Sequence, residues 1–200
     1  MAIKINKKII FSLIIIILLL IAGGVFCWQN REIKGSPEDY VVKETPEGKI
    51  VENKKAGLTV KVPEGWIEEK IEIEESSMIF YSPDAEGYRP NKKTPPLKTG
   101  CVIEIGIMYK KINFEEIKTE IEESHKEFAT TIDEIEMVRI NNSPALKNTY
   151  ETPFLGDETN IDIYIPYGKK VYGITLAAAH PNIEECYKKF DKFLETVSVK

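Results

Sequence analysis

Residues 101–109 have the sequence Cys-Val-Ile-Glu-Ile-Gly-Ile-Met-Tyr, the clearest strand pattern in this chain of 200 residues. Successive side chains of a strand point to opposite faces of a sheet, so alternate residues share one face. The members of the apolar face are Cys101, Ile103, Ile105, Ile107 and Tyr109. The other face includes Glu104 and Gly106. The alternation predicts a strand with one face in the hydrophobic core.

The hydrophobic period changes directly after this strand, from two residues to nearly four. An apolar stripe at helical spacing consists of Phe114, Ile117, Ile121 and Phe128. This spacing predicts an amphipathic helix. Asn113 precedes the stripe as a candidate N-cap, and Glu116 lies at the matching position of a capping box.

Short alternating segments elsewhere predict further strands. They lie at residues 40–42, 49–51, 58–62, 67–73, 78–81, 135–140, 145–151, 161–167 and 171–178. A last helical stripe consists of Ile183, Cys186, Phe190, Phe193, Leu194 and Val197. Short connections between successive strands imply antiparallel pairing, and both helices must bury their stripes on the sheet. Residues 39–200 are therefore predicted to form an α+β domain, an antiparallel sheet packed with helices.

An uncharged apolar run occupies residues 9–28. A helix rises about 1.5 Å per residue, so this run matches the roughly 30 Å hydrocarbon core of a bilayer. Three lysines in the basic segment 1–8 precede it, which by the positive-inside rule places that segment in the cytoplasm. We therefore expect a single-pass signal anchor in the cell membrane, a polar tether at 29–38 and an extracytoplasmic domain.

Cys27 leaves an alternative to the uncleaved anchor. Gly24, Val25 and Phe26 precede it and weakly resemble the cleavage site of a lipoprotein. Phe26 is bulky where such sites have a small residue, and the apolar run exceeds the 7–15 residues typical of signal peptides. We favour the anchor over lipidation of Cys27.

Charge and composition limit the classes of function. The chain has a net charge of −5, and the part after the apolar run has 24 basic and 32 acidic residues, a net charge of −8. A nucleic-acid partner would want a basic face, so none is expected. The sequence has no nucleophile elbow and no glycine-rich phosphate loop, and we predict no catalytic, cofactor or metal residues.

The segment 83–100 is rich in proline and locally basic on an acidic domain. Loops of this length without regular structure are often functional. The candidate partner contacts within it are Tyr88, Arg89, Lys92 and Lys93. The alternative interpretation is a tolerated surface insertion.

Cys101 and Cys186 both lie on predicted apolar faces. Outside the cytoplasm they could be oxidised to a disulfide closing a loop of about 85 residues. The alternative is two separate buried thiols that act as small hydrophobic side chains.

Other polar residues have both a chemical and a structural interpretation. Glu122 and His125 form half of a bundle-type metal motif, but a partly buried histidine at a helix edge is favoured. His180 precedes a helix start, where it is expected to set local geometry. The acidic cluster at 157–162 could hold Ca²⁺ weakly, but turn chemistry and solvation are the favoured explanation.

Residues 57–66, Gly-Leu-Thr-Val-Lys-Val-Pro-Glu-Gly-Trp, resemble the opening strand and turn of PsbP-like proteins. The segments 80–83, 143–145 and 187–197 are similar as well, so the resemblance covers roughly residues 57–200. It implies an antiparallel sheet sandwiched by helices, an α/β/α arrangement. It also implies a binding or assembly role, since the family has no single shared catalytic set, and no functional residue is carried over. The photosynthetic members have a cleaved targeting segment where this chain has a plain anchor.

We therefore expect a non-catalytic, membrane-anchored extracytoplasmic module that binds a protein partner or helps to assemble an envelope complex. One alternative is an envelope hydrolase or metal-binding enzyme whose site forms only in three dimensions. Another is a structural ectodomain of a membrane complex.

Overall fold

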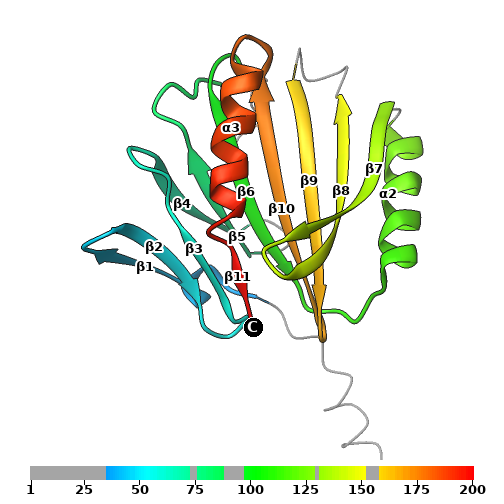
Figure 1. Ribbon diagram of the computed structural model, residues 1–200, viewed down its shortest axis with the longest axis horizontal. Helices are drawn as coiled ribbons and strands as arrows, with labels where there is room; N and C mark the ends of the chain where they lie inside the picture. The colour runs from blue at the N-terminus through cyan, green and yellow to red at the C-terminus, as the bar shows by residue number, and fades with distance from the viewer. Residues whose placement is uncertain (1–34, 73–75, 88–96, 129–130, 152–157) are drawn as a thin grey trace, which may run out of the picture. The chain divides into compact units, whose positions relative to one another are not determined.

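Two antiparallel sheets and two helices make up the described part of the structure, a computed structural model (Figure 1). The described residues are 35–72, 76–87, 97–128, 131–151 and 158–200. Residues 34–200 form one of the two compact units of the chain.

The larger sheet contains β4 (Ile67–Glu72), β5 (Ser76–Tyr81), β6 (Cys101–Met108), β7 (Thr131–Ile140), β8 (Ser143–Glu151), β9 (Glu158–Tyr167) and β10 (Lys170–Ala179). Its spatial order is β4-β5-β6-β10-β9-β8-β7, and every neighbouring pair is antiparallel. β10 therefore lies at the centre, with Thr175 opposite Glu104 of β6 on one side and Asp162 of β9 on the other.

The smaller sheet contains β1 (Tyr40–Thr45), β2 (Gly48–Asn53), β3 (Leu58–Lys61) and β11 (Ser198–Val199), in that order. A 3₁₀ helix, η1 (Pro37–Asp39), leads into β1. The C-terminal residues return to β3, where Lys200 donates a backbone hydrogen bond to Gly57. Gly57 has a φ of +77°, and a Cβ there would lie 2.4 Å from the Lys200 carbonyl oxygen, so this close return requires glycine.

The helices are α2 (Phe114–Phe128) and α3 (Ile183–Leu194), the latter preceded by the 3₁₀ helix η2 (His180–Asn182). The predicted capping box of α2 is confirmed. Glu116 N–H donates to the Asn113 side chain at 2.9 Å, and Asn113 N–H donates to the Glu116 carboxylate at 2.8 Å. Satisfying these two amides fixes where α2 begins.

The helices cover opposite faces of the larger sheet. Successive residues of β9 show this, since Ile163 belongs to the main core with α3 whereas Tyr164 packs in the cluster that contains α2. The smaller sheet shares the main core with α3. Phe80 of β5 and Phe193 of α3 meet in this core with ring centroids 5.4 Å apart. Helices on both faces give the α/β/α layering that the PsbP-like resemblance implied.

The described strands divide into two sheets where the sequence predicted one. The division follows β3, because Pro63 has no backbone N–H to donate to a ladder and Gly65 turns the chain with a φ of +77°. The two-residue strand β11 was also not predicted, since so short a segment carries no readable period.

The predicted anchor at residues 9–28 lies outside the described residues. Within the described ranges, no helix is long and apolar enough to cross a membrane.

Candidate functional site

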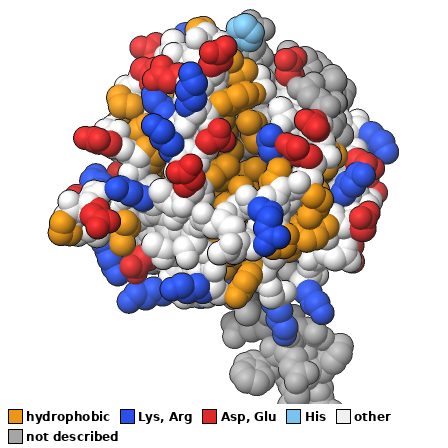
Figure 2. All heavy atoms as spheres, in the orientation of Figure 1, with side chains coloured by type: hydrophobic (Ala, Val, Ile, Leu, Met, Phe, Trp, Pro, Cys, Tyr) orange, Lys and Arg blue, Asp and Glu red, His pale blue; other side chains and the backbone are white. Residues whose placement is uncertain are grey.

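An apolar groove of about 500 Å³ lies between α3 and the β7–β8–β9 part of the larger sheet. Its lining consists of Glu134, Val138, Ile140, Lys147, Thr149, Ile161, Ile163, Tyr187, Phe190, Asp191 and Leu194. Figure 2 shows this face, with hydrophobic side chains gathered beside α3 and charged side chains around them. Its volume lies within the range of sites that bind small molecules or a few side chains.

The two-residue period of the strands and the helical period of α3 determine which side chains line the groove. Ile161 and Ile163 are alternate residues of β9, and they form an apolar floor that continues to Val138 of β7. Tyr187, with Leu194 two turns later on the same helical face, contributes to the wall formed by α3. The groove exists because α3 covers the β6–β10 side of this face and leaves the β7–β9 side open beside it (Figure 1).

The rim of the groove carries charges of both signs. Lys147 is 2.7 Å from Glu136 of the neighbouring strand, and Glu134 and Asp191 add carboxylates. An apolar floor with a mixed polar rim suits an occupant that has both apolar and hydrogen-bonding groups.

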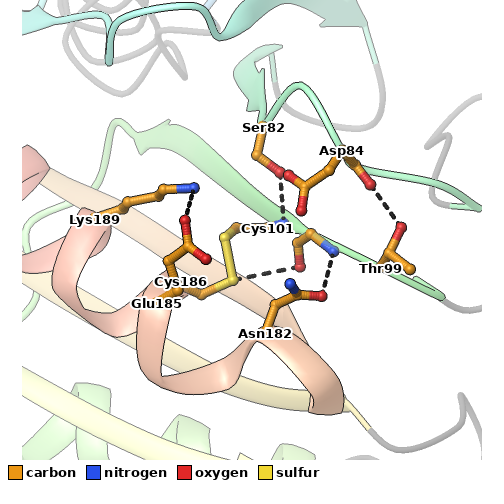
Figure 3. The surroundings of a disulfide bond; sticks show 9 residues. Ser82, Asp84, Thr99, Cys101, Asn182, Glu185, Cys186 and Lys189 are labelled. Carbon is orange, nitrogen blue, oxygen red and sulfur yellow. Dashed lines mark hydrogen bonds and ion pairs between the residues drawn. A yellow bond between two sulfur atoms is a disulfide. The ribbon is translucent and has the colours of Figure 1, made fainter.

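A disulfide between Cys101 and Cys186 attaches α3, the wall of the groove, to β6, with the two Cα atoms 5.6 Å apart (Figure 3). Adjacent contacts fix the same junction. Gly100 N–H donates to the Asn182 side chain at 3.1 Å, and Cys101 N–H donates to the Ser82 hydroxyl at 2.8 Å. Both cysteines are at most 1% exposed, so the bond lies in the core.

A buried polar cluster lies on the opposite face of the sheet, facing α2. Asp162 accepts hydrogen bonds from the Thr175 hydroxyl at 2.7 Å and the Tyr164 hydroxyl at 3.2 Å, and Tyr150 supplies another. Burial raises the pKa of Asp162, while these hydroxyl donors and nearby His125 oppose that rise. Burial, together with the negative charge of Asp162, also raises the pKa of Tyr164.

His125 is 8% exposed and faces the sheet from α2. Its Nε2 lies 3.0 Å from the side-chain nitrogen of Asn148, and its ring packs edge-on against Tyr150 with centroids 4.7 Å apart. The favoured interpretation, a structural histidine on this helix, agrees with these contacts, although the residue is more deeply buried than expected. His180 is exposed in η2 and is not part of this cluster.

The interpretation of the acidic segment 157–162 as solvated turn residues is wrong for Glu158 and Asp162. β9 begins at Glu158, and both side chains are less than 9% exposed. Glu158 accepts a hydrogen bond from the backbone of Leu97, and burial raises the pKa of its carboxyl group. Asp157 is outside the described residues. Among the described residues, no group of His, Cys, Asp and Glu side chains is arranged to hold a metal ion.

The predicted contact residues Tyr88, Arg89, Lys92 and Lys93 lie outside the described residues. Sequence reasoning did not find the groove. Its lining residues appear in the sequence as ordinary alternating strand residues and a helical stripe, and only the spacing of α3 from β7 leaves them open. The one available signal was that a single 12-residue helix, α3, is too narrow to cover seven strands.

The chain was compared with known proteins. No family model matches it, and no curated protein matches it. Among solved structures, the solution structure of cyanobacterial PsbP (CyanoP) from Synechocystis sp. PCC 6803 matches 80% of this chain and 92% of its own, with a TM-score of 0.52 and 10% identity. The fold is PsbP-like.

Two other solved structures are similar. The PsbP-like fold of this chain also matches PA94, a Pseudomonas aeruginosa protein of unknown function, over 80% of this chain and 97% of that one, with a TM-score of 0.50 and 12% identity. A protein of Bacteroides thetaiotaomicron VPI-5482 matches 72% of this chain at 13% identity with a TM-score of 0.45. The match spans only 45% of that protein. At these identities the likeness concerns the fold alone.

Proposed function

We propose that this chain is a membrane-anchored, extracytoplasmic, non-catalytic binding module whose groove takes an apolar segment of a protein partner. The observation that carries the proposal is the groove itself, a hollow between α3 and β7–β9 that has an apolar floor and charged side chains at its rim. Exposed apolar surface rimmed by polar residues is typical of interaction sites.

A protein segment fits the groove better than a purely apolar ligand for two reasons. The rim contains Glu134, Lys147 and Asp191, which can form ion pairs with partner side chains of either sign of charge. β7 is also the last strand of the larger sheet, so its outer backbone groups have no neighbouring strand within that sheet. A partner segment could therefore combine apolar contacts in the groove with main-chain hydrogen bonds.

Site-specific photocrosslinking in native membranes tests this proposal. A photoreactive residue at Val138 faces the groove, whereas the same residue at neighbouring Met137 faces the opposite side of β7 and is 56% exposed. We expect crosslinks to one partner from position 138 and from Thr149, through an apolar peptide of that partner, and none from position 137.

The mass of the adduct distinguishes the occupants. A phospholipid adduct, a dimer of this chain or no adduct at position 138 would each contradict a protein partner in the groove. Val138→Glu should also abolish recovery of the partner, while Met137→Glu should leave it intact. Thermal melting of both variants shows whether any loss comes from unfolding.

The membrane anchor is proposed from residues 9–28 and needs a separate test. If the domain is extracytoplasmic, added protease should degrade a C-terminal tag in intact spheroplasts. A protected tag would contradict the extracytoplasmic location and with it the envelope role. A diacylglyceryl adduct on a chain that starts at Cys27 would instead show a lipoprotein.

A further inference from the structure

Two basic turns come together at one end of the domain. Lys54 and Lys55 lie in the turn between β2 and β3, Lys169 lies in the turn between β9 and β10, and Lys170 is the first residue of β10. The Lys170 ammonium group donates a hydrogen bond to the carbonyl of Ala56, in the first turn. These four lysines, from segments more than 110 residues apart in sequence, form what we call the lysine end.

Tyrosines hold the two turns in this position. The Tyr172 hydroxyl also donates to the Ala56 carbonyl, at 2.5 Å, and Lys55 lies 5.6 Å from the centroid of the Tyr109 ring. Burial raises the pKa of Tyr172 to about 12, so its hydroxyl keeps the proton that it donates. The lysine end is therefore part of a fixed junction between the two sheets.

The described chain begins at the same end. Asp39 of η1 lies 3.0 Å from the Lys55 ammonium group. The ten tether residues 29–38 between the apolar run and Asp39 span at most about 35 Å when extended. If residues 9–28 are in the bilayer, the lysine end lies within reach of its surface.

Charge favours contact with that surface. Lys54 and Lys169 are exposed and have no ion-pair partner among the described residues, and Lys170 is half-buried. The acids that face this end are Asp39 of η1, which pairs with Lys55, and Glu52 of β2, which pairs with Lys43 and interacts with Lys54. Figure 2 shows lysine and arginine side chains along the lower edge of the domain, whereas acidic and basic side chains are mixed over the rest of this face. The net charge of the whole chain conceals this local excess.

We propose that the lysine end binds the anionic headgroups of lipids in the membrane that carries the anchor. The inference rests on the proposed membrane anchorage and adds an orientation to it. Clustered lysines near a membrane surface are attracted by anionic lipid, and the attraction decays within a Debye length. With the lysine end held at the surface, the domain would have a fixed orientation instead of turning freely on its tether.

Amine footprinting of the full-length chain in vesicles tests the proposal. The chain is reconstituted in phosphatidylcholine alone or with about one third phosphatidylglycerol, treated with an acetylating reagent and analysed by mass spectrometry. We expect Lys54 and Lys169 to react at least about threefold more slowly in the anionic vesicles at low salt, and this protection to disappear at about 1 M salt.

Internal controls come from the rest of the chain. Lys98, in the loop before β6, and Lys188, in α3, are exposed and lie outside the lysine end. Their rates of acetylation should therefore be equal in both kinds of vesicle. Lys55 is also exposed and should likewise react more slowly in the anionic vesicles, and exchange of two of the four basic residues, Lys54→Gln with Lys169→Gln, should remove that protection of Lys55. The matched pair Lys98→Gln with Lys188→Gln has the same net charge and should not.

Flotation of the vesicles separates the two proposals. If the chain floats with both kinds of vesicle in high salt and Lys54 and Lys169 react equally in both, the anchor stands and lipid binding by the lysine end is overturned. If the chain floats with neither in high salt, membrane anchorage itself fails. Equal slowing of Lys98 and Lys188 would also overturn the inference, because it would show a general effect of the vesicle charge.

Discussion

Thr175 of β10 donates a hydrogen bond to Asp162 of β9 at 2.7 Å, from the directly opposite position of the neighbouring strand. Asp162 is only 7% exposed, and its partners in the cluster are mainly neutral hydroxyl groups. A buried carboxylate held mainly by hydroxyls depends on each donor, because water cannot replace one that is removed.

Thr175→Val should lower the free energy of unfolding by about 1–3 kcal/mol, the range for a buried polar group that loses its hydrogen-bond partner. Thr175→Ser keeps the hydroxyl and should retain most of the stability. Urea denaturation of the two variants and the wild type measures both effects. Equal losses in the two variants would show that the methyl group of Thr175 matters and its hydroxyl does not.

Asp162 should also make stability depend on pH. Because burial raises its pKa above the unfolded value of 3.8, the folded state binds more protons than the unfolded state between the two values. The free energy of unfolding therefore falls as pH rises through this interval, and the cost of the buried charge is greatest above the folded pKa. At pH below 3.8 the carboxyl group is protonated in both states and this cost is absent.

Asp162→Asn removes this contribution. Measured by urea denaturation between about pH 3.5 and 8, the stability of the variant relative to wild type should increase as pH rises. Glu158, whose pKa burial also raises, keeps part of the same slope in both proteins. Asp84→Asn, at an exposed site, is the control and should leave the slope unchanged. A relative stability of Asp162→Asn that is constant with pH would contradict the raised pKa.

The sequence predicted most of the strands and helices, because the period of their apolar residues and their capping residues are local features. The alternation in 101–109 gave β6, and the stripe beginning at Phe114 with the Asn113–Glu116 capping box gave α2. Features that depend on distant partners were not predictable in this way. β11 exists only because Val199 pairs with Leu58, and the sequence around these two residues does not predict this pairing.

The candidate sites also depend on partners that are distant in the sequence. Asp162 alternates with Ile161 and Ile163, which is the pattern of a strand residue that faces solvent. Its face is buried because α2 packs over it, and this tertiary packing cannot be read from the local pattern. The groove is likewise set by where α3 lies on the sheet. The junction of Cys101 and Cys186 was predicted as one of two alternatives, since the faces could be assigned from the period but the distance between them could not.

Gly100 should be the least replaceable glycine of the disulfide junction. Its φ is +79°, and a Cβ there would lie 2.6 Å from the Ser82 hydroxyl and 2.7 Å from the Ala85 backbone nitrogen. Gly168 has a similar φ of +65° but has nothing within 4 Å of the corresponding position. Gly168→Ala should therefore cost only the backbone strain, roughly 1 kcal/mol.

Gly100→Ala should cost several times more, because it also displaces the backbone at Ala85. Thermal and urea unfolding of both variants give the comparison. The difference between them isolates the steric cost, since the strain of a positive φ is common to both. Similar stabilities for the two variants would contradict the close approach at Gly100.

The disulfide itself can be tested by thiol titration. Denatured, unreduced protein should show one free thiol, that of Cys27, and reduced protein should show three. Removing the bond in a Cys101→Ala and Cys186→Ala variant should lower the free energy of unfolding by up to about 4.5 kcal/mol in the chain-entropy account of a loop of about 85 residues. Cys27→Ala is the control and should not change the stability of the domain.

The effect of losing the disulfide should be uneven along α3. The bond anchors the first turn of the helix, whereas the Asn141 side chain donates hydrogen bonds to the carbonyls of Leu194 and Val197 at its other end. Amide hydrogen exchange in the double variant should therefore increase most near Cys186 and least near Leu194. Uniform acceleration along α3 would contradict separate anchors, and three free thiols in unreduced wild type would contradict the bond.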